Sequence, residues 1–138
     1  MAIEMMYRIG IYDYSQYEDK WNDTEQECME YLKETSIHSA PDNGMFDAVY
    51  PCGAMVNRLL GEALNPEDPG EGIIRFWKEM TVWRATARKT PSEKLFFRTL
   101  EKIGFSKEQL NCLYQLLTTS TDEPGELITH IRRKVRLQ

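Results

Sequence analysis

The sequence has little of what a metal site, a disulfide framework or a membrane span requires. It contains three cysteines and two histidines in 138 residues, without a C-x-x-C spacing, so we expect reduced, mostly buried thiols, no metal site and no cofactor. Uninterrupted apolar runs extend over only a few residues, which excludes a segment that crosses a bilayer. The first ten residues lack the basic and apolar regions of a secretory signal. These absences predict a cytoplasmic protein that does not bind membranes.

The composition is that of a folded domain. Apolar residues make up 41% of the chain and aromatic residues 11%, which is typical of a packed globule and excludes a disordered chain. A length of 138 residues is close to the common size of one domain. We therefore expect residues 1–138 to form a single globular domain.

Negative charge is concentrated in the first part of the chain. Residues 1–50 carry 11 acidic and 3 basic side chains, whereas residues 51–138 carry 11 acidic and 14 basic ones. The net charge of −5 therefore hides one strongly acidic end and one mildly basic end. Such an asymmetry favours an interaction with a charged partner.

The N-terminal residues alternate between apolar and polar. Ile3, Met5, Tyr7, Ile9 and Ile11 fall on one side of an extended chain, which is the period of a half-buried strand. No second run of this quality follows. An unpaired strand edge of this kind would allow a homodimer.

The rest of the chain has helical periodicity. Amphipathic patterns cover approximately 18–35, 51–64, 72–88, 90–103, 106–117 and 124–135. Two capping boxes mark helix starts, one at Thr90 with Glu93 and one at Ser106 with Gln109. Residues 72–88 form the most apolar pattern, with an expected buried stripe of Ile73, Phe76, Trp77, Met80, Trp83 and Ala87. The predicted fold is mainly α, a compact bundle of about six helices preceded by one short N-terminal β-strand.

The helix predicted at 18–35 carries the strongest functional signal. Its carboxylates recur along one helical face, beside tyrosines that suit an interface. We infer a non-enzymatic protein–protein interaction module, such as a small inhibitor, immunity or regulatory protein, whose partner has a basic surface. The predicted binding residues are Tyr14, Tyr17, Asp19, Asp23, Glu27, Glu30 and Glu34. The alternative for these carboxylates is a solvated helix face without a partner.

The C-terminal residues carry the second hypothesis, which is nucleic-acid binding. Four cations, Arg132, Arg133, Lys134 and Arg136, follow one another closely and would contact phosphates. Cations also stabilise a helix C-terminus, and a basic tail can fold back on the acidic helix. A sequence pI near 5.1 makes a nucleic-acid partner the less favoured hypothesis.

Cys52 carries the third hypothesis, a cysteine-dependent hydrolase. It lies at a helix start between Pro51 and Gly53, where unpaired backbone N–H groups lower a thiol pKa. However, Cys52 shares its helical face with Val56, Leu59 and Ala63. We therefore expect a buried structural cysteine, no catalytic residue, and a protein that is more readily explained as a binding module than as an enzyme.

Overall fold

The computed structural model describes residues 2–87 and 93–136, with side chains up to Val82 in the first range. Its helices, in chain order, are α1 (Ala2–Arg8), α2 (Tyr14–Leu32), the 3₁₀ helix η1 (Phe46–Ala48), α3 (Val49–Leu64), α4 (Pro69–Ala87), α5 (Glu93–Ile103), α6 (Lys107–Thr118) and α7 (Pro124–Lys134). The prediction of a mainly helical, compact chain is confirmed. The cap predicted at Thr90 lies outside the described residues.

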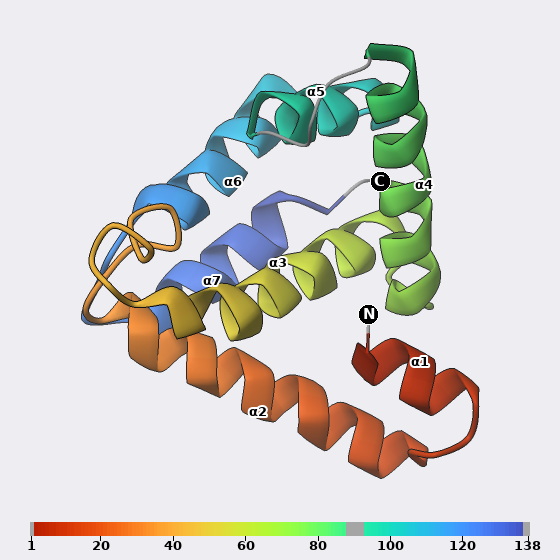
Figure 1. Ribbon diagram of the computed structural model, residues 1–138, viewed down its shortest axis with the longest axis horizontal. Coiled ribbons are helices and arrows are strands. Elements are labelled where there is room, and N and C mark those ends of the chain that lie inside the picture. Colours follow the sequence, from red (N-terminus) through yellow and green to blue (C-terminus); the bar gives the residue numbers. More distant parts are fainter. Residues whose placement is uncertain (1, 88–92, 137–138) are drawn as a thin grey trace.

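Helix α3 is the centre of the arrangement. It packs along α2 on one side, and α4 crosses near its C-terminal end (Figure 1). Helices α5 and α6 lie on the opposite side of α3 from α1 and α2, and α7 returns next to α2 (Figure 1). Because α3 contacts both α2 and α4, the helices that precede it and those that follow it are arranged around this one helix.

The predicted N-terminal strand is wrong, and no strand occurs in the described ranges. Residues 2–8 form α1 instead, since a helix satisfies its backbone hydrogen bonds locally and needs no partner strand. Glu4 and Arg8, one helical turn apart, form an ion pair with Nε–Oε1 at 2.9 Å. Ile9 and Ile11, which the strand would have half-buried, are exposed. The proposed dimer through strand pairing therefore loses its basis.

Glu4 anchors α1 to the remainder of the fold. Glu4 is only 3% exposed, and its carboxylate accepts hydrogen bonds from Arg8 and from the Tyr17 hydroxyl. A Cβ placed on Gly70, at the start of α4, would collide with this carboxylate. Negative charge is favourable beside a helix N-terminus. A residue that the alternating pattern placed in solvent thus forms a buried contact between α1, α2 and α4.

Two capping boxes determine where helices begin. Ser106 and Gln109 cap α6 reciprocally, as predicted, and Gly104 has a positive φ of 127° before the turn. Asp13 and Gln16 form the same motif at α2, so that helix begins four residues earlier than its apolar pattern suggests. Reciprocal capping satisfies two backbone N–H groups that the helix itself leaves unpaired.

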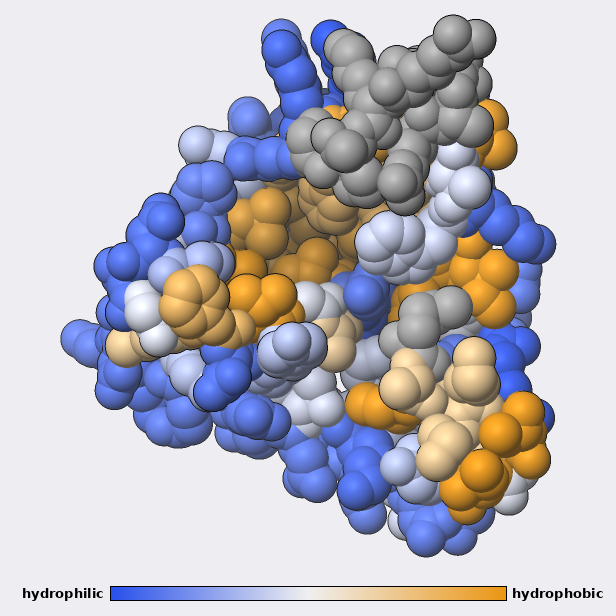
Figure 2. Space-filling model, in the orientation of Figure 1, coloured by the Kyte–Doolittle hydropathy of each residue, from blue (hydrophilic) through white to orange (hydrophobic). Residues whose placement is uncertain are grey.

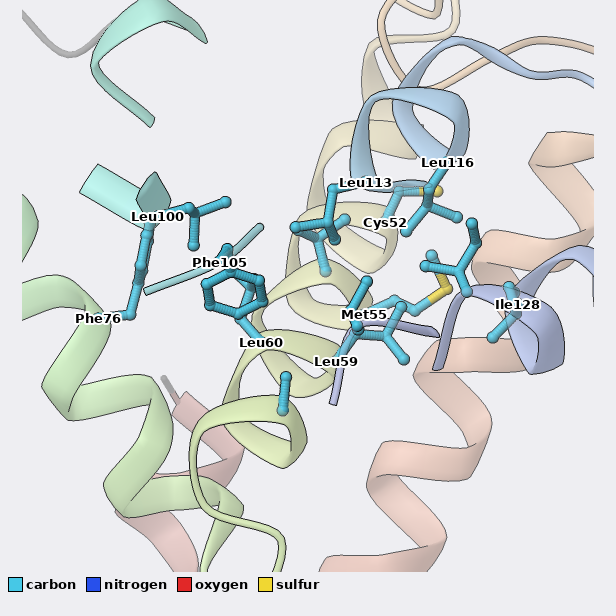
Figure 3. Close-up of a cluster of buried hydrophobic side chains, with 14 of the residues drawn as sticks. Cys52, Met55, Leu59, Leu60, Phe76, Leu100, Phe105, Leu113, Leu116 and Ile128 are labelled. Atoms are coloured by element: carbon cyan, nitrogen blue, oxygen red, sulfur yellow. The ribbon is translucent and has the colours of Figure 1, made fainter. Parts of the chain in front are cut away.

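The main core lies between α3 and the helices around it. Figure 3 shows Met55, Leu59 and Leu60 of α3 meeting Leu113 and Leu116 of α6 and Ile128 of α7. In α4, Ile73, Phe76 and Met80 are buried as predicted, but Trp77 is 39% exposed. Trp83 and Ala87 belong to the side chains that are not described. The core stripe of α4 is therefore narrower than predicted, since Trp77 lies at its edge.

A disulfide between Cys28 and Cys52 crosses this core and joins α2 to α3. Cys52 is buried, as predicted, but the expectation of reduced thiols is wrong for these two residues. Their Cα atoms lie 4.8 Å apart, a separation that a disulfide spans readily. Cysteines 24 residues apart in sequence gave no spacing motif, because their proximity results from the packing of two helices.

Candidate functional site

The outer face of α2 and its C-terminal extension presents the predicted carboxylates. Asp19, Asp23, Glu27, Glu30 and Glu34 are all exposed. Within the described part of the chain, only Glu30 of these five has an ion-pair partner, Lys33, at 3.2 Å. At a period of 3.6 residues, the five positions fall within one side of a helix. The outer face therefore has negative groups that the fold itself does not neutralise.

The opposite side of α2 uses its carboxylates inside the fold. Glu18 accepts a hydrogen bond from Arg58 of α3 at 3.3 Å, and Glu25 accepts one from Arg132 of α7 at 2.9 Å. Glu62 of α3 joins these pairs, since it accepts from Arg58 at 3.1 Å and from Arg132 at 2.8 Å. One continuous network of alternating charges thus connects α2, α3 and α7.

Burial by itself lowers the pKa of both arginines. For Arg58, the nearby Tyr17 and Glu62 outweigh burial and raise the pKa. For Arg132, Glu62 and Glu25 have the same effect. Both guanidinium groups therefore stay charged, and the role of the network is to connect α2, α3 and α7 within the fold. It borders a polar cleft of about 350 Å³ whose floor includes Trp21 and Met55.

Comparison of the chain with protein-family models, with curated proteins and with solved structures found no match.

The structure separates the two tyrosines of the predicted binding surface. Tyr14 is 64% exposed, whereas Tyr17 is 5% exposed. Tyr17 donates its hydroxyl to Glu4 at 2.8 Å and accepts from Arg58 at 2.6 Å, and its ring stacks on Tyr7 with centroids 4.3 Å apart. The prediction that Tyr17 belongs to an exposed surface is wrong. Its position on the buried stripe of α2, four residues before Trp21, already indicated burial.

We expect Tyr17 to make the stability of the protein sensitive to alkaline pH. Burial, together with the hydrogen bond to Glu4, raises the pKa of Tyr17 to about 12, although Arg58 opposes the shift. The neutral phenol is thus favoured in the folded state over the unfolded state, in which the pKa is near 10. This effect stabilises the folded state by about 2 kcal/mol. The stabilisation is fully present below pH 10 and is lost as the pH rises through 12.

Urea unfolding at a series of pH values from 9 to 12 measures this loss. Tyr17→Phe removes the titrating group, so its free energy of unfolding is expected to fall less steeply over this range. Tyr14→Phe is the matched control, because Tyr14 is exposed on the same helix, and it retains the wild-type slope. Equal slopes for Tyr17→Phe and the wild type would contradict the assignment.

The C-terminal cations do not form one free row. Arg132 pairs with Glu25 and Glu62, and Lys134 lies 3.9 Å from Glu108. Arg133 and Arg136 are exposed, and Arg136 borders the polar cleft. Arg132 thus folds back on the acidic helix, which was the alternative to phosphate binding. Because Arg132 is engaged in the fold, the four cations are not available together to contact phosphates.

The structure also removes the candidate nucleophile of the hydrolase hypothesis. Cys52 is bonded to Cys28, and a disulfide sulfur is not a thiolate nucleophile. His38 pairs loosely with Glu93 at 3.6 Å. Among the described residues, no group of three or more histidines, cysteines, aspartates or glutamates is arranged to hold a metal ion. In the same residues, no helix is long and apolar enough to cross a membrane.

Proposed function

We propose that the protein is a non-enzymatic interaction module that binds a basic surface of another protein through the outer face of α2. The observation that supports this proposal is the division of the α2 carboxylates. Glu18 and Glu25 are paired with arginines inside the fold, whereas Asp19, Asp23, Glu27 and Glu34 are exposed without an ion-pair partner in the described residues. A face of one charge sign steers a partner of opposite sign and disfavours partners of like sign.

Tyr14 is exposed at the start of α2 but does not belong to this surface. At 3.6 residues per turn, it lies on the side of Tyr17 and Trp21, opposite the carboxylates. Its ring lies 6.4 Å from the ring of Tyr7 of α1, centroid to centroid. The proposed binding residues are therefore Asp19, Asp23, Glu27, Glu30 and Glu34, and Tyr14 and Tyr17 are removed from the set.

Charge reversal tests the proposal. Asp23→Lys, Glu27→Lys and Glu34→Lys together are expected to weaken binding to a basic partner at least about tenfold, mainly through the association rate. Partners captured from the native cell by the wild type are quantified by mass spectrometry beside this variant. The matched control reverses three exposed carboxylates elsewhere, Glu67, Glu101 and Asp122, so its net charge is the same. Equal capture by both variants would rule out the α2 face.

A cytoplasmic location is part of the proposal and has a consequence for the disulfide. Reducing compartments keep most thiols free, so there Cys28 and Cys52 are expected to exchange between the bonded and reduced states. Alkylation of intact cells, followed by mass spectrometry of the two cysteine peptides, measures this fraction. A fully bonded pair in the native cell would instead indicate an oxidising compartment.

A further inference from the structure

The polar cleft beside the charge network lies between α2, α3 and the end of α7. Its volume is about 350 Å³, at the lower end of the range of small-molecule sites. It shares no lining residue with the hydrophobic hollow that Figure 2 shows between α3, α4, α5 and α6. Three carboxylates and three guanidinium groups line the cleft: Glu18, Glu25, Glu62, Arg58, Arg132 and Arg136. A ligand in this cleft is therefore recognised through charge and hydrogen bonds.

Arg136 is the charged side chain of the cleft that the fold leaves unpaired. The three carboxylates already accept hydrogen bonds from Arg58 and Arg132, whereas Arg136 is exposed and has no ion-pair partner within the described residues. Its backbone is nevertheless fixed, because its carbonyl oxygen accepts from the Gln109 side chain at 3.1 Å and the preceding Val135 is fully buried. The cleft thus has one unpaired guanidinium group on an anchored backbone.

Trp21 provides a second unpaired donor at the cleft. The residue is only 4% exposed, and its indole N–H has no hydrogen-bond acceptor among the described residues. The large majority of buried side-chain polar atoms in folded proteins do have a partner. The Arg58 guanidinium lies over the same ring, with Cζ 5.3 Å from the ring centroid. Because Trp21 lines the cleft, an acceptor from outside the chain reaches it by this route.

The charges and donors of the cleft select the chemistry of its ligand. Both unpaired groups are donors, and a carboxylate accepts from an indole N–H and, with charge assistance, from a guanidinium group. The six lining charges cancel, so a ligand with one negative charge is favoured over a polyanion, which the three carboxylates would repel. Met55, Pro66 and Pro69 also line the cleft. These apolar residues favour a ligand that has an apolar part.

We propose that this cleft binds a small organic monocarboxylate, whose carboxylate accepts hydrogen bonds from the Trp21 indole N–H and from Arg136. The two donors come from α2 and from the residues just after α7. The ion pairs of Arg58 and Arg132 connect these helices and so keep the donors in place. The cleft lies on the side of α2 opposite its outer face, so this site does not depend on the proposed protein interface.

Titration of the full chain with benzoate and hexanoate, followed by NMR, tests the proposal. Both acids are expected to shift the indole N–H signal of Trp21 with a Kd of about 1 mM, which is within the binding efficiency of ligands of this size. Trp21→Phe lacks this signal and so assigns it. The indole N–H of Trp77, which donates to Asn57 at 3.0 Å, is the internal reference and is expected not to shift. Benzamide and hexanamide have the same apolar parts without the charge, and they are expected to bind at least about tenfold more weakly.

Arg136→Gln is expected to weaken benzoate binding at least about tenfold, because it removes the charge-assisted contact and leaves the ion pairs of the fold intact. Arg133→Gln is the matched control. Arg133 is exposed on α7 and does not line the cleft, so the same loss of charge is expected to leave the affinity unchanged.

Three outcomes would overturn the proposal. The first is an unchanged Trp21 signal at about 20 mM of either acid, well above the expected Kd. The second is an equal loss of affinity in Arg133→Gln and Arg136→Gln, which would indicate a response to net charge alone. The third is binding of inorganic phosphate as tight as that of the two acids, since the cleft would then accept any oxyanion.

Discussion

Breaking the disulfide between Cys28 and Cys52 is expected to lower the free energy of unfolding by about 3.5 kcal/mol. The two cysteines are 24 residues apart, and cross-linking a loop of this length removes a corresponding amount of conformational entropy from the unfolded chain. The bond also joins α2 to α3 within the main core. For a chain of this length, the expected decrease in melting temperature is about 12 °C.

Urea unfolding of the wild type with and without a reducing agent measures the effect without changing any side chain. Cys28→Ala with Cys52→Ala is expected to resemble the reduced protein. Cys112→Ala is the matched control, because Cys112 is a free, half-buried thiol. This variant keeps the bond, so the reducing agent is expected to destabilise it as much as the wild type. Alkylation of the denatured, unreduced protein should modify Cys112 alone. Modification of all three cysteines would show that the bond is absent.

Gly61→Ala is expected to lower the free energy of unfolding by about 3 kcal/mol. A Cβ at this position would overlap the carbonyl oxygen of Pro69 and lie 2.8 Å from Cγ1 of Ile73. Gly72 faces Gly61 from α4 and would collide with its backbone in the same way. Because backbone atoms are involved, no change of rotamer relieves the overlap, and α3 must move away from α4.

Gly53→Ala is the matched control for this substitution, since both glycines lie in α3. No atom of the described residues lies within 4 Å of a Cβ at Gly53, so alanine is expected to stabilise the helix by about 0.5 to 1 kcal/mol. Chemical denaturation of the two variants beside the wild type gives effects of opposite sign. Similar stability for Gly61→Ala and the wild type would mean that α3 and α4 cross less closely than in this structure.

The sequence was sufficient to predict the helices whose signals are local. The capping box of Ser106 and Gln109 and the start of α7 near Pro124 depend on neighbouring residues, and so they can be predicted from the order of the residues. The N-terminal prediction failed because it used a local pattern alone. The alternation in residues 3–11 predicted a strand, whereas in the structure residues 2–8 form a helix in which Glu4 is buried against α2 and α4.

By itself, the sequence determined that the chain is mainly helical and that α2 carries a row of acidic residues, since both follow from periodicity. Only the tertiary structure decided which of those residues are consumed within the fold. Glu18 and Glu25 meet arginines 40 and 107 residues later, whereas Asp23 and Glu27 on the same helix meet solvent. The same is true of the Cys28–Cys52 bond and of the contact between Gly61 and α4, because both depend on how helices cross. Packing brings together residues distant in sequence, and no local pattern encodes that geometry.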